Sequence, residues 1–205
     1  MTRSFTYRGS AAHIVFGAGK RDETGAWVEK LGCSNAMVLS TPHQERDAAH
    51  LSDQLGSLSA GVFAKATMHT PVDVTDEAME AVKSVGADCV VSLGGGSTTG
   101  LGKAIAYRTD LPQVVIPTTY AGSEVTPILG QTESGRKTTV RGDSILPEVV
   151  IYDLELTMGL PLGMSLTSGL NAMAHAAEAL YAQDRNPVSS LMAAEGLAAF
   201  KRSLP

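Results

Sequence analysis

Short apolar segments alternate with helix-compatible segments through most of this 205-residue chain. Six segments rich in valine and isoleucine are typical of strands in a sheet buried on both faces: 11–17, 35–41, 60–66, 88–94, 113–119 and 148–153. Three segments between the early strands carry helix signals, and each ends at a glycine, a common helix stop: 20–32, 44–56 and 75–86. We interpret the third helix as beginning at Thr75. The alternation predicts an α/β fold with a doubly wound, mostly parallel, Rossmann-like sheet.

Two parts of the chain depart from this alternation. In residues 127–140, two extended runs flank Glu133-Ser134-Gly135, which predicts a β-hairpin. After the last strand, a linker rich in proline and glycine, residues 154–164, leads into two helices separated by Pro187. Two helices cannot bury their own apolar faces. We therefore expect residues 1–157 to form an α/β dinucleotide-binding domain, and residues 158–205 to begin a helical substrate domain that continues past residue 205.

Composition and charge exclude several classes of protein. The net charge of −5 and the pI near 5.5 provide no basic surface for nucleic acid or acidic membranes. No apolar run approaches the roughly 18–20 residues that span a bilayer, and the first ten residues lack the hydrophobic core of a signal peptide. We expect a soluble, cytoplasmic protein in which Cys33 and Cys89 are reduced and buried.

The sharpest local motif is a glycine turn between a strand and a helix that we expect to start near Thr98. Its residues are Gly94, Gly95, Gly96 and Ser97. Glycines let backbone N–H groups approach an anion, and a helix N-terminus adds positive potential. The two standard phosphate-binding fingerprints do not fit, because Thr99 and Leu101 stand where they need glycine and lysine. A tight turn without a ligand remains the alternative.

A second polar loop follows the next strand. It supplies four hydroxyl groups, on Thr118, Thr119, Ser123 and Thr126. Loops at the carboxyl ends of parallel strands converge on the ligand site of such sheets. Turn chemistry alone is the alternative for this loop. Together the two loops predict a site for a phosphorylated cofactor.

One amide and one imidazole, Asn171 and His175, stand four residues apart in the alanine-rich segment 167–181. On an α-helix this spacing places both side chains on one face. From the residues alone, such a pair can bind a metal, line a substrate pocket or be satisfied within a core.

Four motifs occur in the order and spacing of the iron-containing (group III) alcohol dehydrogenases: residues 94–106, 117–126, 146–161 and 168–181. The chain resembles this superfamily, and within it the maleylacetate reductases. The resemblance implies reduction of the carbon–carbon double bond of maleylacetate, a small dicarboxylate, to 3-oxoadipate in the degradation of aromatic compounds. It also implies NADH or NADPH as the cofactor and a homodimer.

The resemblance further implies roles for individual residues. The glycine turn binds the cofactor pyrophosphate, and Thr118 and Thr119 lie against the cofactor. Lys137, on the hairpin, reaches the cofactor ribose region, although a solvated charge is the alternative. Ser40 and Thr41 stand where many NAD-preferring members have an acidic residue, so we expect NADPH to be accepted alongside NADH.

Two departures from the family pattern concern the metal. Gly100 stands where iron-dependent members have aspartate after the glycine turn, and Asn171 replaces the aspartate that precedes the histidine by four residues. A neutral amide offers a cation only a weak dipole, whereas a carboxylate neutralises part of its charge. We therefore expect no metal, and we assign Asn171 and His175 to substrate orientation and proton donation.

Three alternatives stay open at this point. The first is an iron- or zinc-dependent alcohol dehydrogenase that acts on a small alcohol or aldehyde, and the second is a non-catalytic nucleotide-binding domain. The third, a structural α/β domain without a ligand, is disfavoured by the two converging loops. Because residues past 205 are expected to complete the pocket, we expect little activity from these 205 residues alone.

Overall fold

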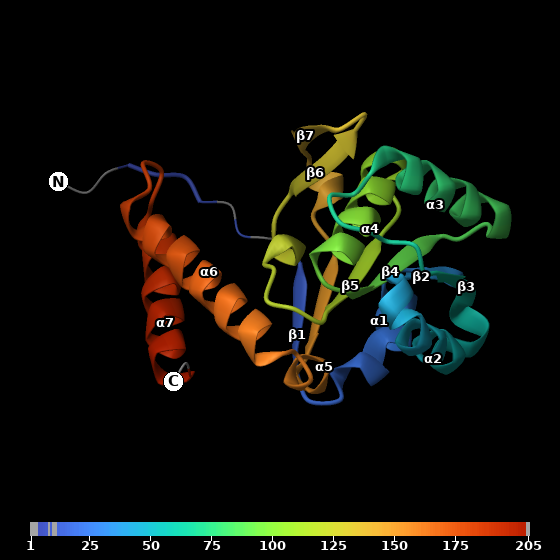
Figure 1. Cartoon of the computed structure of the whole chain (residues 1–205), viewed down its shortest axis with the longest axis horizontal. Helices are drawn as coiled ribbons and strands as arrows, with labels where there is room; N and C mark the ends of the chain where they lie inside the picture. Colours follow the sequence, from blue (N-terminus) through green and yellow to red (C-terminus); the bar gives the residue numbers. More distant parts are fainter. Residues whose placement is uncertain (1–3, 8, 10–11, 204–205) are drawn as a thin grey trace. The chain divides into compact units, whose positions relative to one another are not determined.

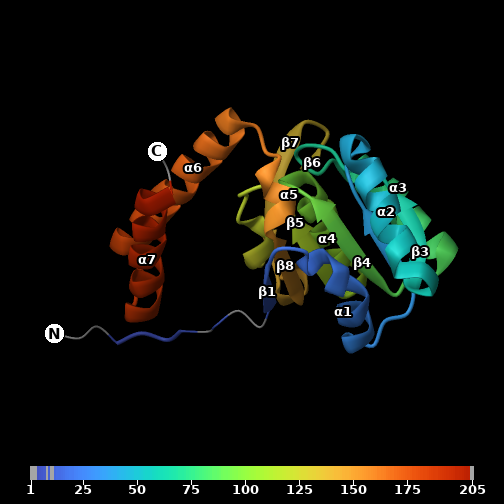
Figure 2. The same cartoon turned by 90° about the horizontal axis from the view of Figure 1, so that it is seen from below.

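Six parallel strands form one sheet in the order β1-β8-β5-β4-β2-β3, which confirms the predicted Rossmann-like class (Figure 1). The computed structural model describes residues 4–7, 9 and 12–203. The strands are β1 (His13–Gly17), β2 (Ala36–Leu39), β3 (Ser59–Phe63), β4 (Cys89–Gly94), β5 (Gln113–Pro117) and β8 (Val149–Asp153). β1 and β3 form the opposite edges of the sheet (Figure 2).

Helices cover both faces of the sheet, which explains why its central strands are apolar along their whole length. On one face, α1 (Thr24–Lys30) and α2 (Glu45–Leu55) pack against a core that includes Val38, Val91 and Ile151. On the other, α3 (Val72–Val85) and α4 (Gly96–Thr109) pack against Met37, Leu39 and Val90. Short 3-10 helices join these elements: η1 (Lys20–Glu23), η2 (Pro42–Gln44), η3 (Gly56–Leu58), η4 (Ser123–Val125) and η5 (Asp143–Ile145).

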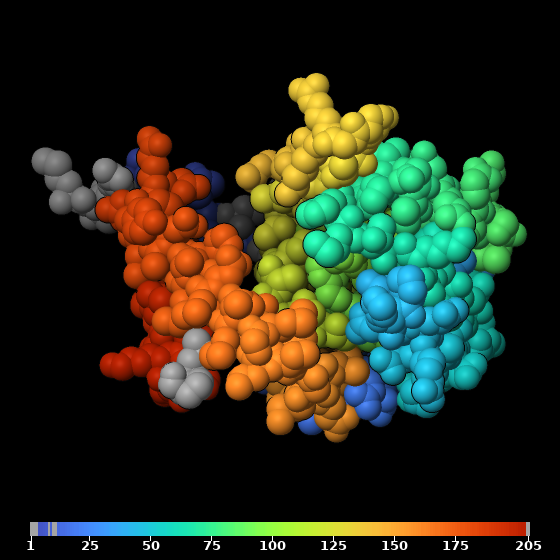
Figure 3. Space-filling model, viewed as in Figure 1, coloured from blue at the N-terminus to red at the C-terminus, as the bar shows by residue number. Residues whose placement is uncertain are grey.

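The predicted hairpin is confirmed and projects from the surface of this part of the protein (Figure 3). Its strands are β6 (Ile128–Glu133) and β7 (Arg136–Arg141), which pair antiparallel. The two turn residues, Ser134 and Gly135, have φ angles of 49° and 75°. Two successive positive φ angles are what a two-residue hairpin turn requires for its twist to match that of the strands.

Two helices begin earlier than predicted. The third helix, α3, starts at Val72 rather than at Thr75, because Pro71 precedes the first turn and its carbonyl accepts the Thr75 hydroxyl at 3.1 Å. The helix after the glycine turn, α4, starts at Gly96 rather than near Thr98. The Gly95 carbonyl already accepts the N–H of Thr98, at 3.1 Å, so the glycines form part of the first turn.

The linker predicted over residues 154–164 is largely helical. It contains α5 (Leu154–Met158), and α6 (Leu162–Tyr181) begins directly after Pro161. Asp153 initiates α5, since its carboxylate accepts the N–H of Glu155 at 3.0 Å. The last helix, α7 (Pro187–Ser203), has Pro187 as its first residue, where a missing N–H costs nothing.

The chain divides into two compact units, and their boundary along the sequence lies between Gly159 and Leu160. One unit is Ala12–Gly159, with the sheet and the hairpin. The other contains α6 and α7 together with the described residues before Ala12. The boundary expected from the sequence was residue 157. None of the helices in the described part of the chain combines the length and apolar character needed to cross a membrane.

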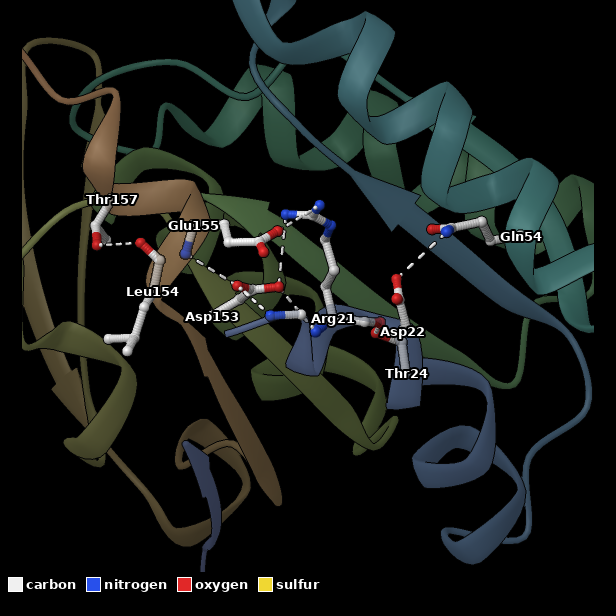
Figure 4. Close-up of polar contacts among 9 residues, drawn as sticks. Arg21, Asp22, Thr24, Gln54, Asp153, Leu154, Glu155 and Thr157 are labelled. Atoms are coloured by element: carbon white, nitrogen blue, oxygen red, sulfur yellow. Dashed lines mark hydrogen bonds and ion pairs between the residues drawn. The ribbon is translucent and has the colours of Figure 1, made fainter. Parts of the chain in front are cut away.

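The buried Asp153 carboxylate ties the turn after β1 to the end of β8 (Figure 4). One oxygen accepts the N–H of Gly19 at 3.0 Å, and the other accepts the N–H of Arg21 at 3.1 Å. The Arg21 guanidinium lies 3.5 Å from the same carboxylate and 3.0 Å from that of Glu155. Gly19, in this turn, has a positive φ of 71°, which glycine adopts without strain.

Replacing Asp153 with Asn preserves its size but turns one oxygen into a donor that faces backbone N–H groups. We expect Asp153→Asn to lower the free energy of unfolding by about 2–4 kcal/mol, measured by urea denaturation. The matched control is Glu155→Gln, which alters an exposed partner of the same arginine and should cost less than about 1 kcal/mol. Equal losses in the two variants would contradict this role of Asp153.

Candidate cofactor-binding site

The chain reverses its direction across the sheet between β4 and β2. From β2 it continues outward to β3, whereas from β4 it continues the other way to β5 and β8. In open α/β sheets, ligands bind at the carboxyl ends of the strands beside such a reversal. The residues that follow β2 and β4 at this edge are Ser40 and the glycine turn, both of which the sequence singled out.

Packing requires glycine at two positions of the turn. A Cβ on Gly94 would lie 2.4 Å from Thr98 Oγ1, and the residue has a φ of 154°. A Cβ on Gly95 would lie 2.9 Å from Thr119 Oγ1. Gly96 differs, because a Cβ there would meet only Ala121 Cβ, at an ordinary 3.6 Å, and the residue is exposed. The protein's own packing therefore leaves Gly96 unexplained, whereas close approach of a ligand to the backbone would explain it.

Two buried hydroxyl groups at this edge have no hydrogen-bond partner among the described residues: Ser40 Oγ and Thr98 Oγ1. Ser40 was a predicted site residue, but Thr98 was not. Thr98 stands in the first turn of α4, whose opening N–H groups, at Gly96 and Ser97, have no carbonyl one turn earlier within the helix. Unpaired buried donors beside a helix N-terminus suit an anionic group such as a phosphate.

The start of the second predicted loop, directly after β5, lies against the glycine turn. The Thr118 N–H donates to the Gly94 carbonyl at 3.1 Å, and the Thr118 hydroxyl accepts the side-chain amide of Gln44 at 3.1 Å. Thr119 contacts Gly95 through the close approach described above. The predicted residues after β2, β4 and β5 therefore come together. Gln44 joins this group, although the sequence did not indicate it.

Thr41 and Lys137 occupy more open positions. Thr41 is partly exposed and directly precedes η2. Lys137 is exposed on β7, opposite Thr132 in the hairpin. A role for either residue in cofactor binding stays a prediction.

Lys103 was not among the predicted residues, yet it is the largest fully buried side chain in the described part of the chain. It extends from α4, and its ammonium donates to the carbonyls of Ser123, of Thr126 (2.7 Å) and of Ile128 (3.0 Å). Desolvation lowers the pKa of Lys103 to about 8, and the nearby Glu124 carboxylate acts in the opposite direction. The sequence signal was a lysine in an otherwise apolar helical stretch, residues 101–106.

The hydroxyls of Ser123 and Thr126 face this lysine, at 3.2 and 3.1 Å from its Nζ. Ser123 and Thr126 were expected to contact the cofactor, and that role stays a prediction. In the structure, Lys103 is a partner of both hydroxyls within the protein. Glu124, between them, is buried, and it accepts the Tyr152 hydroxyl at 2.9 Å. Burial and the Glu124 carboxylate together raise the pKa of Tyr152.

A steric reason accounts for Gly100, which stands where iron-dependent family members have aspartate. A Cβ at this position would lie 2.3 Å from Thr70 Oγ1. Thr70 is buried and has a φ of 44°, so its segment is closely fitted against α4. A side chain at position 100 would therefore require residues around Thr70 to move.

Asn171 and His175 lie on α6, in the helical unit, and both are exposed. His175 Nδ1 lies 3.3 Å from Glu178 Oε2 on the same helix, a partner that the sequence reading did not consider. The assignment of Asn171 and His175 to a substrate remains a prediction.

Cys33 and Cys89 are buried free thiols, as predicted. Together with Asp88 they are a group of potential metal ligands within 4.8 Å of one another, found among the described residues. The group has a structural explanation, because the Asp88 carboxylate accepts the N–H groups of Ser34 and Asn35 at 2.7 and 2.9 Å. Burial raises the pKa of both thiols. Cys89 is the first residue of β4, at the opposite end of that strand from the glycine turn, and Cys33 precedes β2.

A cavity of about 190 Å³ opens beside Leu93, the residue before the glycine turn. α2 contributes His50 to its lining, and α5 contributes Leu156. The cavity lies on the face that α2 covers, and its lining among the described residues includes no member of the glycine turn or of the loop after β5.

Comparison with known proteins identifies relatives across the chain. The family model "Iron-containing alcohol dehydrogenase" matches residues 11–154. Maleylacetate reductase of Rhizobium sp. (strain MTP-10005) is 68% identical over 98% of this chain and 57% of its own length. The crystal structure of maleylacetate reductase from Agrobacterium tumefaciens matches with a TM-score of 0.98 and 66% identity, over 100% of this chain and 58% of that one.

A more distant structure, sulfoacetaldehyde reductase from Bifidobacterium kashiwanohense in complex with NAD+, matches with a TM-score of 0.91 and 25% identity. The match covers 97% of this chain and 59% of that one. The chain thus spans little more than half the length of the relatives that it matches.

Gly96 allows a test that separates a phosphate site from a bare turn. We expect Gly96→Ala to leave the free energy of unfolding unchanged or to raise it by up to about 1 kcal/mol, because alanine favours helices. The added methyl group should nevertheless weaken NADH binding by about tenfold or more, since it covers the N–H groups that a phosphate would approach. Urea denaturation and titration of NADH fluorescence measure the two effects.

The matched control is Gly25→Ala in α1, whose Cβ would make only ordinary contacts, with Leu58 at 3.5 Å and with Leu55 at 3.7 Å. This variant should bind NADH like the wild type. Unchanged NADH affinity in Gly96→Ala as well would favour the ligand-free turn.

Proposed function

Because the chain belongs to the iron-containing alcohol dehydrogenase family, we propose that it is the cofactor-binding part, with the start of the substrate-binding part, of an NAD(P)H-dependent maleylacetate reductase. The high identity to maleylacetate reductases along almost the whole chain is the observation that carries this proposal. The reaction reduces the carbon–carbon double bond of maleylacetate and gives 3-oxoadipate. We place it in the degradation of aromatic compounds.

The residues at the carboxyl edge of the sheet fit a dinucleotide. The N-terminus of α4 and the exposed backbone at Gly96 would hold the pyrophosphate, and the unpaired Thr98 hydroxyl adds a donor. Ser40 would contact a ribose, since it directly follows β2 on the other side of the chain reversal. The NAD+ complex of the sulfoacetaldehyde reductase supports this class of cofactor.

The proposed reaction needs a group that stabilises charge on the substrate ketone. When bound, the reduced nicotinamide supplies a hydride to the alkene carbon β to that ketone, and negative charge then develops on the ketone oxygen. A hydrogen-bond donor or general acid at that oxygen lowers the barrier. We assign this task to Asn171 and His175, the amide for orientation and the imidazole for proton donation.

The donor set on α6 does not fit the iron that the family name implies. Asn171 is neutral, and a divalent cation at this position would lose the carboxylate that partly neutralises its charge. We therefore propose that proton donation and orientation by polar side chains replace Lewis-acid catalysis. A cytoplasmic location and a homodimer complete the proposal.

The proposed reaction can be tested with a protein of the full length of these relatives. When maleylacetate is added, we expect NADH to be oxidised, which is measured as the loss of NADH absorbance. Simple aldehydes should give no comparable rate. Activity should survive dialysis against a chelator, and purified protein should contain no stoichiometric metal. Reduction of simple aldehydes but not of maleylacetate, with bound iron or zinc, would establish the alcohol dehydrogenase alternative. Binding of NADH without turnover of either substrate would favour the non-catalytic alternative.

The residues after β2 lead to a second prediction, which concerns the preference between NADH and NADPH. Ser40 and Thr41 present hydroxyl groups instead of a carboxylate, so nothing at these positions repels a 2′-phosphate. We expect kcat/KM for NADPH to lie within about tenfold of that for NADH. The variant Thr41→Asp, at the partly exposed position, should shift the ratio toward NADH by charge repulsion, and a wild-type enzyme that already rejects NADPH strongly would contradict the prediction.

A further inference from the structure

The segment that follows β5 is fixed at both ends, but by different groups. At its start, Thr118 bonds to the Gly94 carbonyl and to Gln44. At its end, residues 123–128 surround the ammonium of Lys103. Between these anchors, Thr119 and Ala121 lie against Gly95 and Gly96 of the glycine turn. The shape of residues 119–122 therefore depends on both anchors.

Lys103 is well suited to be the second anchor. Its ammonium reaches three backbone carbonyls and two hydroxyls, all from residues 123–128, whereas the lysine itself belongs to α4. Every one of these contacts is with an oxygen, and an ammonium has only donors to offer. A neutral apolar side chain of the same length would leave buried carbonyls without a partner.

The geometry also excludes direct chemistry by Lys103. Its side chain is fully buried, and its ammonium is enclosed by the carbonyl groups of residues 123–128. Its helix is nevertheless the one whose first turn carries the glycines of the proposed phosphate site. One end of α4 would thus contact the cofactor, while Lys103, further along, shapes the loop that lies over that contact.

We infer that Lys103 is a positioning residue for cofactor binding: its buried ammonium holds residues 123–128, and thereby sets residues 119–122 against the glycine turn. This inference rests on the proposed function, because it takes the glycine turn as the site of NADH. Lys103 is not a catalytic residue in this scheme, since it does not touch the reacting groups. Its loss should weaken NADH binding while leaving the chemical step intact.

The test uses Lys103→Met in the full-length protein, since methionine is also unbranched but carries no charge or donor. We expect the Kd for NADH, measured by fluorescence titration, and the KM for NADH to rise by about tenfold or more. At saturating NADH, kcat should stay within about twofold of the wild type, because the substrate-binding residues are unchanged. The matched control is Lys83→Met, which removes an exposed lysine from α3 and should leave both quantities unchanged.

A purely structural role for Lys103 predicts a different result. The melting temperature and the fraction of active protein would fall, but the Kd for NADH per folded molecule and the KM would not change. That outcome would overturn the inference. If Lys103→Met does not fold, Thr126→Val replaces it, since valine removes the hydroxyl that contacts the ammonium and retains the side-chain shape. We expect a smaller rise in Kd, of about threefold, and an unchanged Kd would overturn the inference.

The same titrations separate this inference from the proposed function. Wild-type protein that binds NADH but does not reduce maleylacetate would refute the proposed substrate, and the Kd values of the variants would still decide the role of Lys103. Wild-type protein that reduces maleylacetate, with equal NADH affinity in Lys103→Met, would overturn the inference alone. Wild-type protein that does not bind NADH would overturn both.

Discussion

Burial of the parallel sheet on both faces is the constraint on which the other features depend. A strand covered on both sides has no face for polar side chains, so β4, β5 and β8 are almost entirely apolar. Polar chemistry is therefore confined to the segments that leave the strands. Because all six strands run the same way, the segments that leave β2, β4 and β5 meet at one edge.

This constraint explains why much of the fold was readable from the sequence. Apolar runs of strand length, separated by helices that end in glycine, allow few arrangements other than a doubly wound sheet. The hairpin was readable because Ser134 and Gly135 tolerate the positive φ angles of a tight turn. The helix starts at Val72 and Gly96 were less accessible, since they depend on hydrogen bonds from backbone N–H groups to the Pro71 and Gly95 carbonyls rather than on a side-chain pattern.

The candidate site was only partly readable for a similar reason. The sequence indicated which loops meet, but not which side chains turn inward. Ser123 and Thr126 looked like ligand donors because they are hydroxyl residues in a loop beside glycine, whereas the structure places them around Lys103. A buried lysine is rare, and its apolar helical neighbours give no hint of the oxygen atoms that surround it. The partners come from a segment some twenty residues away, so no local pattern reveals them.

The surroundings of Lys103 have the chemistry of a monovalent cation site. Three carbonyl oxygens and two hydroxyl oxygens around one positive charge are ligands that a potassium or ammonium ion would also accept. Here the ion is covalently tethered to the chain, so its occupancy does not depend on salt concentration and it cannot be lost by dilution. The Lys103 ammonium thus takes the place of a structural ion, and the sequence itself ensures that this charge is present at the loop.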